Sequence, residues 1–196
     1  MPKLDLPKQF IIFDTEYTSW EGAKQRDWTG PNEHRELVQI GALKVTYPAL
    51  EVIDEYQELL IPEINPELSD YFTNLTHITP AQLDQHGHPP RDIIKKFAEW
   101  SEDLPLYSYG HDDAILEENC QLLGIPCPIA SDHFHNIKEI FITHGIDADS
   151  YMSSTIVKAF GEKPTRPGHD ALNDAHTIVD GLRLLSSSSP PPSSEA

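Results

Sequence analysis

A short apolar run at Gln9–Asp14 (QFIIFD) is followed two residues later by a second carboxylate, Glu16. The run is short enough to form a buried strand. Because alternate strand residues point to the same face, both carboxylates are directed toward one point at the edge of a core. Partly buried like charges repel one another unless a cation compensates them, and such oxygen ligands suit Mg²⁺ or Mn²⁺. A lone D-x-E pair also occurs on many solvated surfaces, so the pair alone does not decide between these interpretations.

Hydrophobic periodicity predicts a mixed-sheet α/β domain. We expect strands at Gln9–Asp14, Glu36–Thr46, Val52–Leu60, Leu104–Tyr109 and Ser131–Asn136. We expect helices at Asp70–Leu75, Thr79–His86, Arg91–Trp100, Asp112–Leu123, Ile137–Thr143, Tyr151–Phe160 and Asp170–Leu185. The first three strands are expected to form an antiparallel meander.

The length of 196 residues suits one domain, which we assign to residues 1–185. The Ser/Pro-rich stretch 186–196 lacks apolar periodicity and is expected to be a disordered tail. We expect no membrane partner, because no apolar run approaches the roughly 18 residues that cross a bilayer. Cys120 and Cys127 form neither a disulfide framework nor a zinc site by themselves, and no secretory signal is evident, so a cytoplasmic location is the default expectation.

The charge balance excludes one class of nucleic-acid protein. The chain has 14 Lys and Arg against 32 Asp and Glu, a formal net charge of −18. A broad basic surface for duplex binding is therefore not expected. A nucleic-acid substrate would have to be held locally or through metal ions, and the acidity could instead serve solubility alone.

Two further acidic segments open predicted helices. Asp112 and Asp113 follow Gly110, directly after the fourth predicted strand. His169 and Asp174 stand at the start of the last predicted helix. Each segment alone is explained by helix capping or by a solvated carboxylate. Placed just before the helix, His169 can face a site that Asp174 helps to build.

The combination resembles the DEDDh branch of the DnaQ-like 3′→5′ exonuclease superfamily over about Gln9–Leu185. The D-x-E pair matches the first motif, Asp113 the second, and His169 with Asp174 the third. Because Asp112 adjoins Asp113, the choice between them stays open. The resemblance implies an RNase H-like mixed sheet of about five strands flanked by helices.

A finer similarity is to the KapD-like and histone-mRNA 3′-exonuclease-like group. Leu75–Thr79 (LTHIT) looks like the family's LTGIT turn, with His77 where glycine is usual. The strong acidity departs from what an enzyme travelling along RNA is expected to show.

The resemblance also implies a two-metal mechanism using Mg²⁺ or Mn²⁺. According to this resemblance, the first ion is bound by Asp14, Glu16 and Asp174. Asp14 bridges to the second, which has Asp113 nearby. His169 is the implied general base, since an imidazole near its usual pKa can accept a proton from water. The implied product is a nucleoside 5′-monophosphate.

The implied partner is single-stranded nucleic acid, with RNA favoured over DNA. Thr15, Tyr17 and Phe72 are candidate substrate-binding residues, the last two by stacking on a base. Both rings suit a core or rim position equally well. The segment Thr18–Glu33 is expected to be a loop, and its two tryptophans and two cations could cradle a strand or pack on the body of the domain.

Three alternatives compete with this interpretation. An enzyme acting on very short oligomers would need few phosphate contacts and would suit an acidic surface. A non-catalytic nucleic-acid or partner-binding module is disfavoured because every motif position carries a functional residue type. A proofreading subunit of a polymerase is the third. The sequence leaves the oligomeric state open.

Overall fold

A mixed β-sheet forms the centre of the computed structural model, which describes residues 3–187. Within these residues the strand order is β4-β3-β2-β1-β5-β6. The strands are β1 (Gln9–Tyr17), β2 (Leu37–Thr46), β3 (Val52–Leu60), β4 (Gly87–His88), β5 (Leu106–Ser108) and β6 (Phe134–Asn136). The first three form the expected antiparallel meander, and β5 pairs in parallel with both β1 and β6. The carboxyl ends of β1 and β5 therefore meet at one edge, where α/β sheets place their ligand sites.

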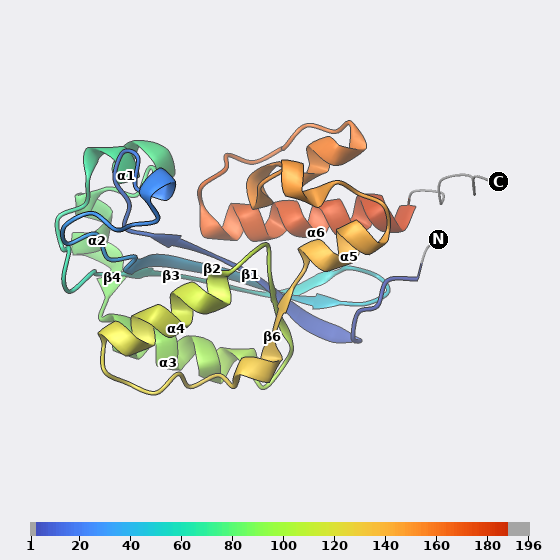
Figure 1. Cartoon of the computed structure of the whole chain (residues 1–196). Helices are drawn as coiled ribbons and strands as arrows, with labels where there is room; N and C mark the ends of the chain where they lie inside the picture. Colours follow the sequence, from blue (N-terminus) through green and yellow to red (C-terminus); the bar gives the residue numbers. More distant parts are fainter. Residues whose placement is uncertain (1–2, 188–196) are drawn as a thin grey trace.

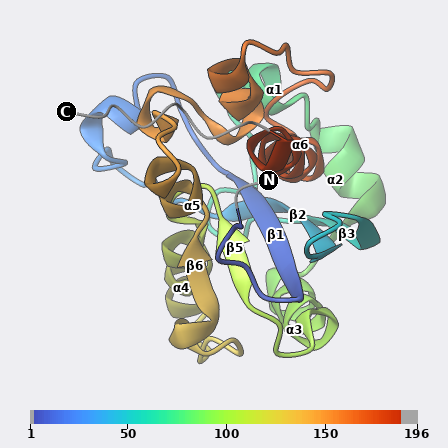
Figure 2. The same ribbon diagram turned by 90° about the vertical axis from the view of Figure 1, so that its right-hand side faces the viewer.

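Helices cover both faces of this sheet (Figures 1 and 2). The α-helices are α1 (Asp70–Thr76), α2 (Pro80–His86), α3 (Pro90–Ser101), α4 (Asp112–Leu122), α5 (Lys138–Thr143) and α6 (Ala171–Ser187). Short 3₁₀ segments are η1 (Lys24–Arg26), η2 (Ser131–His133), η3 (Ala148–Ser150) and η4 (Ser153–Phe160). In Figure 1, α5 and α6 lie on one face and α3 and α4 on the other.

Alternate residues of β1 enter two separate cores. Phe10 and Ile12 belong to the core beneath α5, α6 and η4. Ile11 and Phe13 belong to the core that α3 and α4 cover. The alternation continues past the apolar residues, so the two D-x-E carboxylates turn toward α6, whereas Thr15 between them turns toward α4.

The mixed α/β class is confirmed, with small differences in detail. The two-residue strand β4, which pairs with β3, was not predicted, because two residues carry no periodic pattern. The first half of the predicted strand Ser131–Asn136 is a 3₁₀ turn, and most of the predicted helix Tyr151–Phe160 is 3₁₀ rather than α. Thr79 caps α2 through a capping box with Gln82, as the sequence before Pro80 suggests.

The last helix extends two residues into the predicted tail. It ends at Ser187, so Ser186 and Ser187 are helical, and the rest of that tail lies outside the described residues. Among the helices of residues 3–187, none has the length and apolar character needed to cross a membrane.

A glycine on β2 permits α6 to approach the sheet. Gly41 pairs with Asp14 across the β1–β2 ladder. A Cβ atom on Gly41 would lie 2.2 Å from the backbone nitrogen of Leu172 and 2.4 Å from the carbonyl carbon of Ala171. The first turn of α6 therefore lies directly on this glycine, beside Asp14 on the neighbouring strand.

We expect Gly41→Ala to destabilise the protein by about 1–3 kcal/mol, because backbone atoms of α6 must move to admit the methyl group. Urea unfolding would show a lower midpoint. Gly30→Ala is the control, since its Cβ would meet only the end of the Glu33 side chain. An unchanged midpoint for Gly41→Ala would contradict the close approach of α6.

Candidate active site

Three carboxylates meet at the carboxyl end of β1. Asp14 and Glu16 come from β1, and Asp174 comes from the first turn of α6. One oxygen from each lies within 4.8 Å of the others. The three residues are only 6%, 9% and 2% exposed, respectively. The structure thus brings together three of the four predicted ligands from segments about 160 residues apart in the chain.

The fourth carboxylate near this cluster is Asp112 rather than Asp113. Asp112 lies at the start of α4, and its Oδ1 accepts hydrogen bonds from the backbone nitrogen of Thr15 at 3.1 Å and from Thr15 Oγ1 at 2.6 Å. Its charge acts on both Asp14 and Glu16. The side chain of Asp113 makes no hydrogen bond or ion pair in the described residues, and its charge acts on Asp112. This geometry favours Asp112 over the predicted Asp113, which lies one residue, or about 100° on a helix, further along.

Burial and mutual repulsion favour the protonated forms of these groups. Burial, followed by the neighbouring carboxylates, raises the pKa of Asp14 and of Glu16 well above their usual values. Burial also raises the pKa of Asp112 to about 6, although the hydrogen bonds from Thr15 oppose the shift. The pKa of Asp174 is raised to about 7, again chiefly by burial. A cluster with these properties stays fully ionised at neutral pH only if cations compensate it.

The donor set fits divalent cations. Asp174 Oδ2 accepts hydrogen bonds from Ser153 Oγ at 3.3 Å and from the backbone nitrogen of His169 at 3.4 Å. Its other oxygen, Oδ1, is buried and has no hydrogen-bond partner in the described part of the chain. A buried carboxylate oxygen without a donor is costly unless a cation binds it. Carboxylate oxygens are the ligands that Mg²⁺ and Mn²⁺ prefer.

His169 precedes α6 and is partly buried beside the cluster. Its backbone φ of +62° is a left-handed conformation that residues other than glycine rarely adopt. Burial lowers the pKa of its imidazole, and the positive charges of Lys24 and His77 lower it further. The ring is therefore neutral at neutral pH and able to accept a proton.

Side-chain amides fix the start of α6. The backbone nitrogen of Ala171 donates to Gln39 Oε1 at 2.8 Å, and Gln39 Nε2 donates to Asp170 Oδ2 at 3.0 Å. Asp170 Oδ1 in turn accepts from the backbone nitrogen of Asn173 at 2.9 Å. Gln39 and Ser153 were not predicted as site residues from the sequence. A signal existed for Gln39, which is a polar residue inside an otherwise apolar strand.

The predicted substrate-binding residues lie in different environments. Thr15 is buried and holds Asp112 as described. Tyr17 is partly buried and packs against Trp28, with ring centroids 5.5 Å apart and ring planes tilted by 57°. Phe72 is only 1% exposed and packs with Val38 in a small core cluster, so its ring offers little surface to a base. Stacking by Tyr17 stays a prediction, whereas the packing of Phe72 indicates a core role.

Part of the Thr18–Glu33 segment packs on the body of the domain, whereas half of its residues are exposed. Trp28 contacts Tyr17, and the Arg35 guanidinium lies 5.6 Å from its ring centroid. Arg26 is held by an ion pair with Glu33. In the described residues, no hydrogen bond or ion pair engages the ammonium group of Lys24, whose charge reaches His169.

Comparison with protein families gives one extended match. The family described as "Exonuclease" (RNase_T) matches residues 11–182. The 3'-5' exoribonuclease 1 of Rattus norvegicus is 29% identical over 188 residues, covering 89% of this chain and 52% of that protein. The Homo sapiens protein of the same name is 29% identical over 140 residues, covering 66% of this chain and 38% of its own length. The chain thus spans about half the length, or less, of these relatives.

Solved structures confirm an RNase H-like nuclease fold. The nuclease domain of 3'hExo, a DEDDh family member bound to rAMP, matches with a TM-score of 0.79 at 24% identity, covering 95% of this chain and 96% of that one. E. coli Exonuclease I in complex with a dT13 oligonucleotide matches with a TM-score of 0.67 at 14% identity, covering 92% of this chain and 41% of that one.

We expect the melting temperature in EDTA to fall as the pH rises from 5 to 8. The pKa values of Asp112 and Asp174 are raised in the folded state, so the native protein binds more protons than the unfolded chain, and stability is lost as the pH passes through about 6 to 7. Adding Mg²⁺ or Mn²⁺ should raise the melting temperature more at pH 8 than at pH 5.

Asp174→Asn should flatten this pH dependence and abolish the stabilisation by metal, whereas Asp113→Asn should leave both in place. The second variant controls for the acidity of the whole chain. Equal metal effects at pH 5 and pH 8 would argue against a cation at the cluster.

Proposed function

Because the chain belongs to the exonuclease (RNase_T) family, we propose that it is a metal-dependent 3′→5′ exonuclease that hydrolyses single-stranded nucleic acid to nucleoside 5′-monophosphates. The observation that carries this proposal is the meeting of Asp14, Glu16 and Asp174, within 4.8 Å, beside His169. We propose RNA as the preferred strand, in line with the names of the sequence relatives. The DNA oligonucleotide bound to E. coli Exonuclease I keeps single-stranded DNA as the second candidate.

The carboxylates would hold two Mg²⁺ or Mn²⁺ ions, with Asp14, Glu16 and Asp174 as ligands and Asp112 beside them. When bound, such ions activate water and stabilise the leaving oxygen of a phosphodiester. The positive charge of these ions would also neutralise the carboxylate cluster, so that an anionic strand can approach an acidic protein.

His169 is the proposed general base. Its neutral imidazole takes a proton from the attacking water while the water oxygen bonds to the terminal phosphorus. The bond from phosphorus to the 3′ oxygen of the preceding nucleotide breaks, that oxygen takes up a proton from solvent, and His169 returns its proton to solvent. A nucleoside 5′-monophosphate leaves, and the strand is one nucleotide shorter. Lys24, whose charge acts on His169, is the nearby group suited to contact a phosphate of the strand.

The function is tested with 5′-labelled 20-mers of RNA and DNA of one sequence, in Mg²⁺ or Mn²⁺. We expect a ladder that shortens from the 3′ end, faster for RNA, and no cleavage in EDTA. His169→Gln should lower kcat by about 10²–10⁴-fold, because it removes the proton acceptor and leaves the carboxylates in place. Cleavage of dinucleotides alone would favour the short-oligomer alternative. Binding without cleavage of any substrate would favour a non-catalytic module.

The neighbouring aspartates provide a matched pair of variants. Asp112→Asn should lower kcat by about a hundredfold or more, because it removes a charge facing the metal ligands and weakens the contact with Thr15. Asp113→Asn should stay within about twofold of the wild type. The opposite ranking, measured on the same 20-mer, would restore Asp113 as the residue of the second motif.

A further inference from the structure

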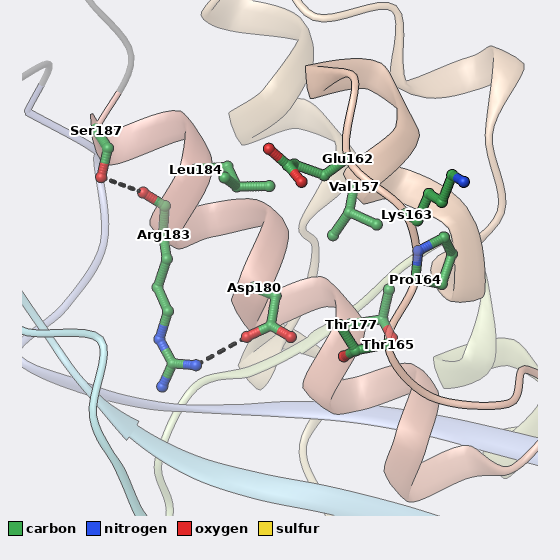
Figure 3. Close-up of a pocket in the computed structure, with 10 residues that line it drawn as sticks. All are labelled: Val157, Glu162, Lys163, Pro164, Thr165, Thr177, Asp180, Arg183, Leu184 and Ser187. Carbon is green, nitrogen blue, oxygen red and sulfur yellow. Dashed lines mark hydrogen bonds and ion pairs between the residues drawn. The ribbon is translucent and has the colours of Figure 1, made fainter.

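The segment that carries His169 is separated from α6 by an open pocket. The pocket has a volume of about 340 Å³. One wall is formed by Glu162, Lys163, Pro164 and Thr165, and the other by residues of α6 that include Thr177, Asp180 and Arg183 (Figure 3). Because a pocket lies between them, this stretch of the segment gains little packing against the helix it faces.

One ion pair crosses from the segment to the helix. Arg166 Nη1 donates to Asp180 Oδ2 at 2.7 Å. Both side chains are about one-third exposed. Among the described residues, this is the side-chain hydrogen bond that links residues 161–167 to α6. At this stretch, the segment is therefore held to α6 by the ion pair of Arg166 rather than by packing.

The acceptor of this ion pair is itself fixed. Asp180 Oδ1 accepts a hydrogen bond from Arg183 Nη1 at 2.8 Å (Figure 3). Arg183 also donates from Nε and Nη2 to the carbonyl oxygen of Leu50, at 3.1 and 2.8 Å. The contact made by Arg166 therefore ends on a carboxylate whose position is set by a second arginine.

His169 needs external support. Its left-handed backbone is unfavourable for a residue with a Cβ, so surrounding contacts must maintain it. The residue after His169 is Asp170, which accepts hydrogen bonds from Gln39 and Gln57. The residue before it is Gly168, which lies so close to Ser154 that a Cβ added to Gly168 would be 2.7 Å from the Ser154 Cβ. Arg166 stands two residues before this close contact and provides the last side-chain anchor ahead of His169.

We propose that Arg166 is a positioning residue, whose ion pair with Asp180 fixes the segment that presents the His169 ring to the carboxylate cluster. The proposal rests on the proposed nuclease function for its catalytic consequence. A base displaced by a fraction of an ångström slows the chemical step without weakening substrate binding. The competing role for Arg166, direct contact with a substrate phosphate, would instead act on binding and on its salt dependence.

The kinetic test compares Arg166→Gln, Arg166→Lys, Asp180→Asn and the double variant Arg166→Gln/Asp180→Asn on the single-stranded 20-mer. We expect Arg166→Gln and Asp180→Asn each to lower kcat by about tenfold, with KM within about twofold of the wild type. The double variant should be no slower than either single variant, because both remove one interaction. Arg166→Lys should recover most of the activity. Lys163→Gln is the matched control, since it removes a positive charge from the same segment and leaves both Arg166 and Asp180 unchanged.

A second readout does not depend on catalysis. The Cε1–Hε1 NMR signal of His169, assigned with His169→Gln, should shift in Arg166→Gln and Asp180→Asn but not in Lys163→Gln. An unmoved signal, or a raised KM with unchanged kcat in Arg166→Gln, would overturn the proposal. A shifted signal in a protein that cleaves no substrate would retain Arg166 as the residue that positions the ring and would refute the nuclease function.

Discussion

Four carboxyl groups that repel one another are held together at the end of β1, and the rest of the fold maintains them there. The apolar residues of β1 place Asp14 and Glu16 by packing into a core that α6 covers. Gly41 lets the first turn of α6 lie on the sheet, and Gln39 fixes the backbone of that turn. Burial of like charges opposes folding. The favourable free energy from packing the two cores must therefore exceed the unfavourable free energy of burying these carboxyl groups.

The parts of the site that depend on local periodicity could be predicted from the sequence. Strand alternation places the D-x-E carboxylates on one face, and the start of a helix places Asp174. The choice between Asp112 and Asp113 could not be made, because either residue suits the first turn of α4 and only the contact with Thr15, 97 residues away, separates them. Ser153 was missed for a similar reason, since its hydrogen bond to Asp174 exists only after two segments have packed together. The fold class followed from the order of strands and helices, whereas β4 depends on a pairing too short to leave a pattern.

Several cations of this acidic chain are engaged in ion pairs with its own carboxylates. Arg26 pairs with Glu33, Arg35 with Glu118, and Lys44 with Glu102. The aromatic residues that could have stacked on bases are also engaged, since Trp28 packs on Tyr17 and Phe72 lies in a core. The surface therefore offers few cations and few free rings to a nucleic acid. In the proposed function, cations held at the carboxylates would supply much of the attraction for phosphate, in agreement with the net charge of −18.

The position of Asp174 on α6 has a consequence for the protein during its synthesis. The helix that carries it is the last described element of the chain, and its apolar residues as far as Leu185 belong to the core beneath it. A nascent chain that still has α6 inside the ribosomal tunnel holds Asp14, Glu16 and Asp112 without their partner. The complete cluster forms only after this helix emerges and docks. The carboxylate cluster is thus assembled only after nearly all of the described chain has been synthesised.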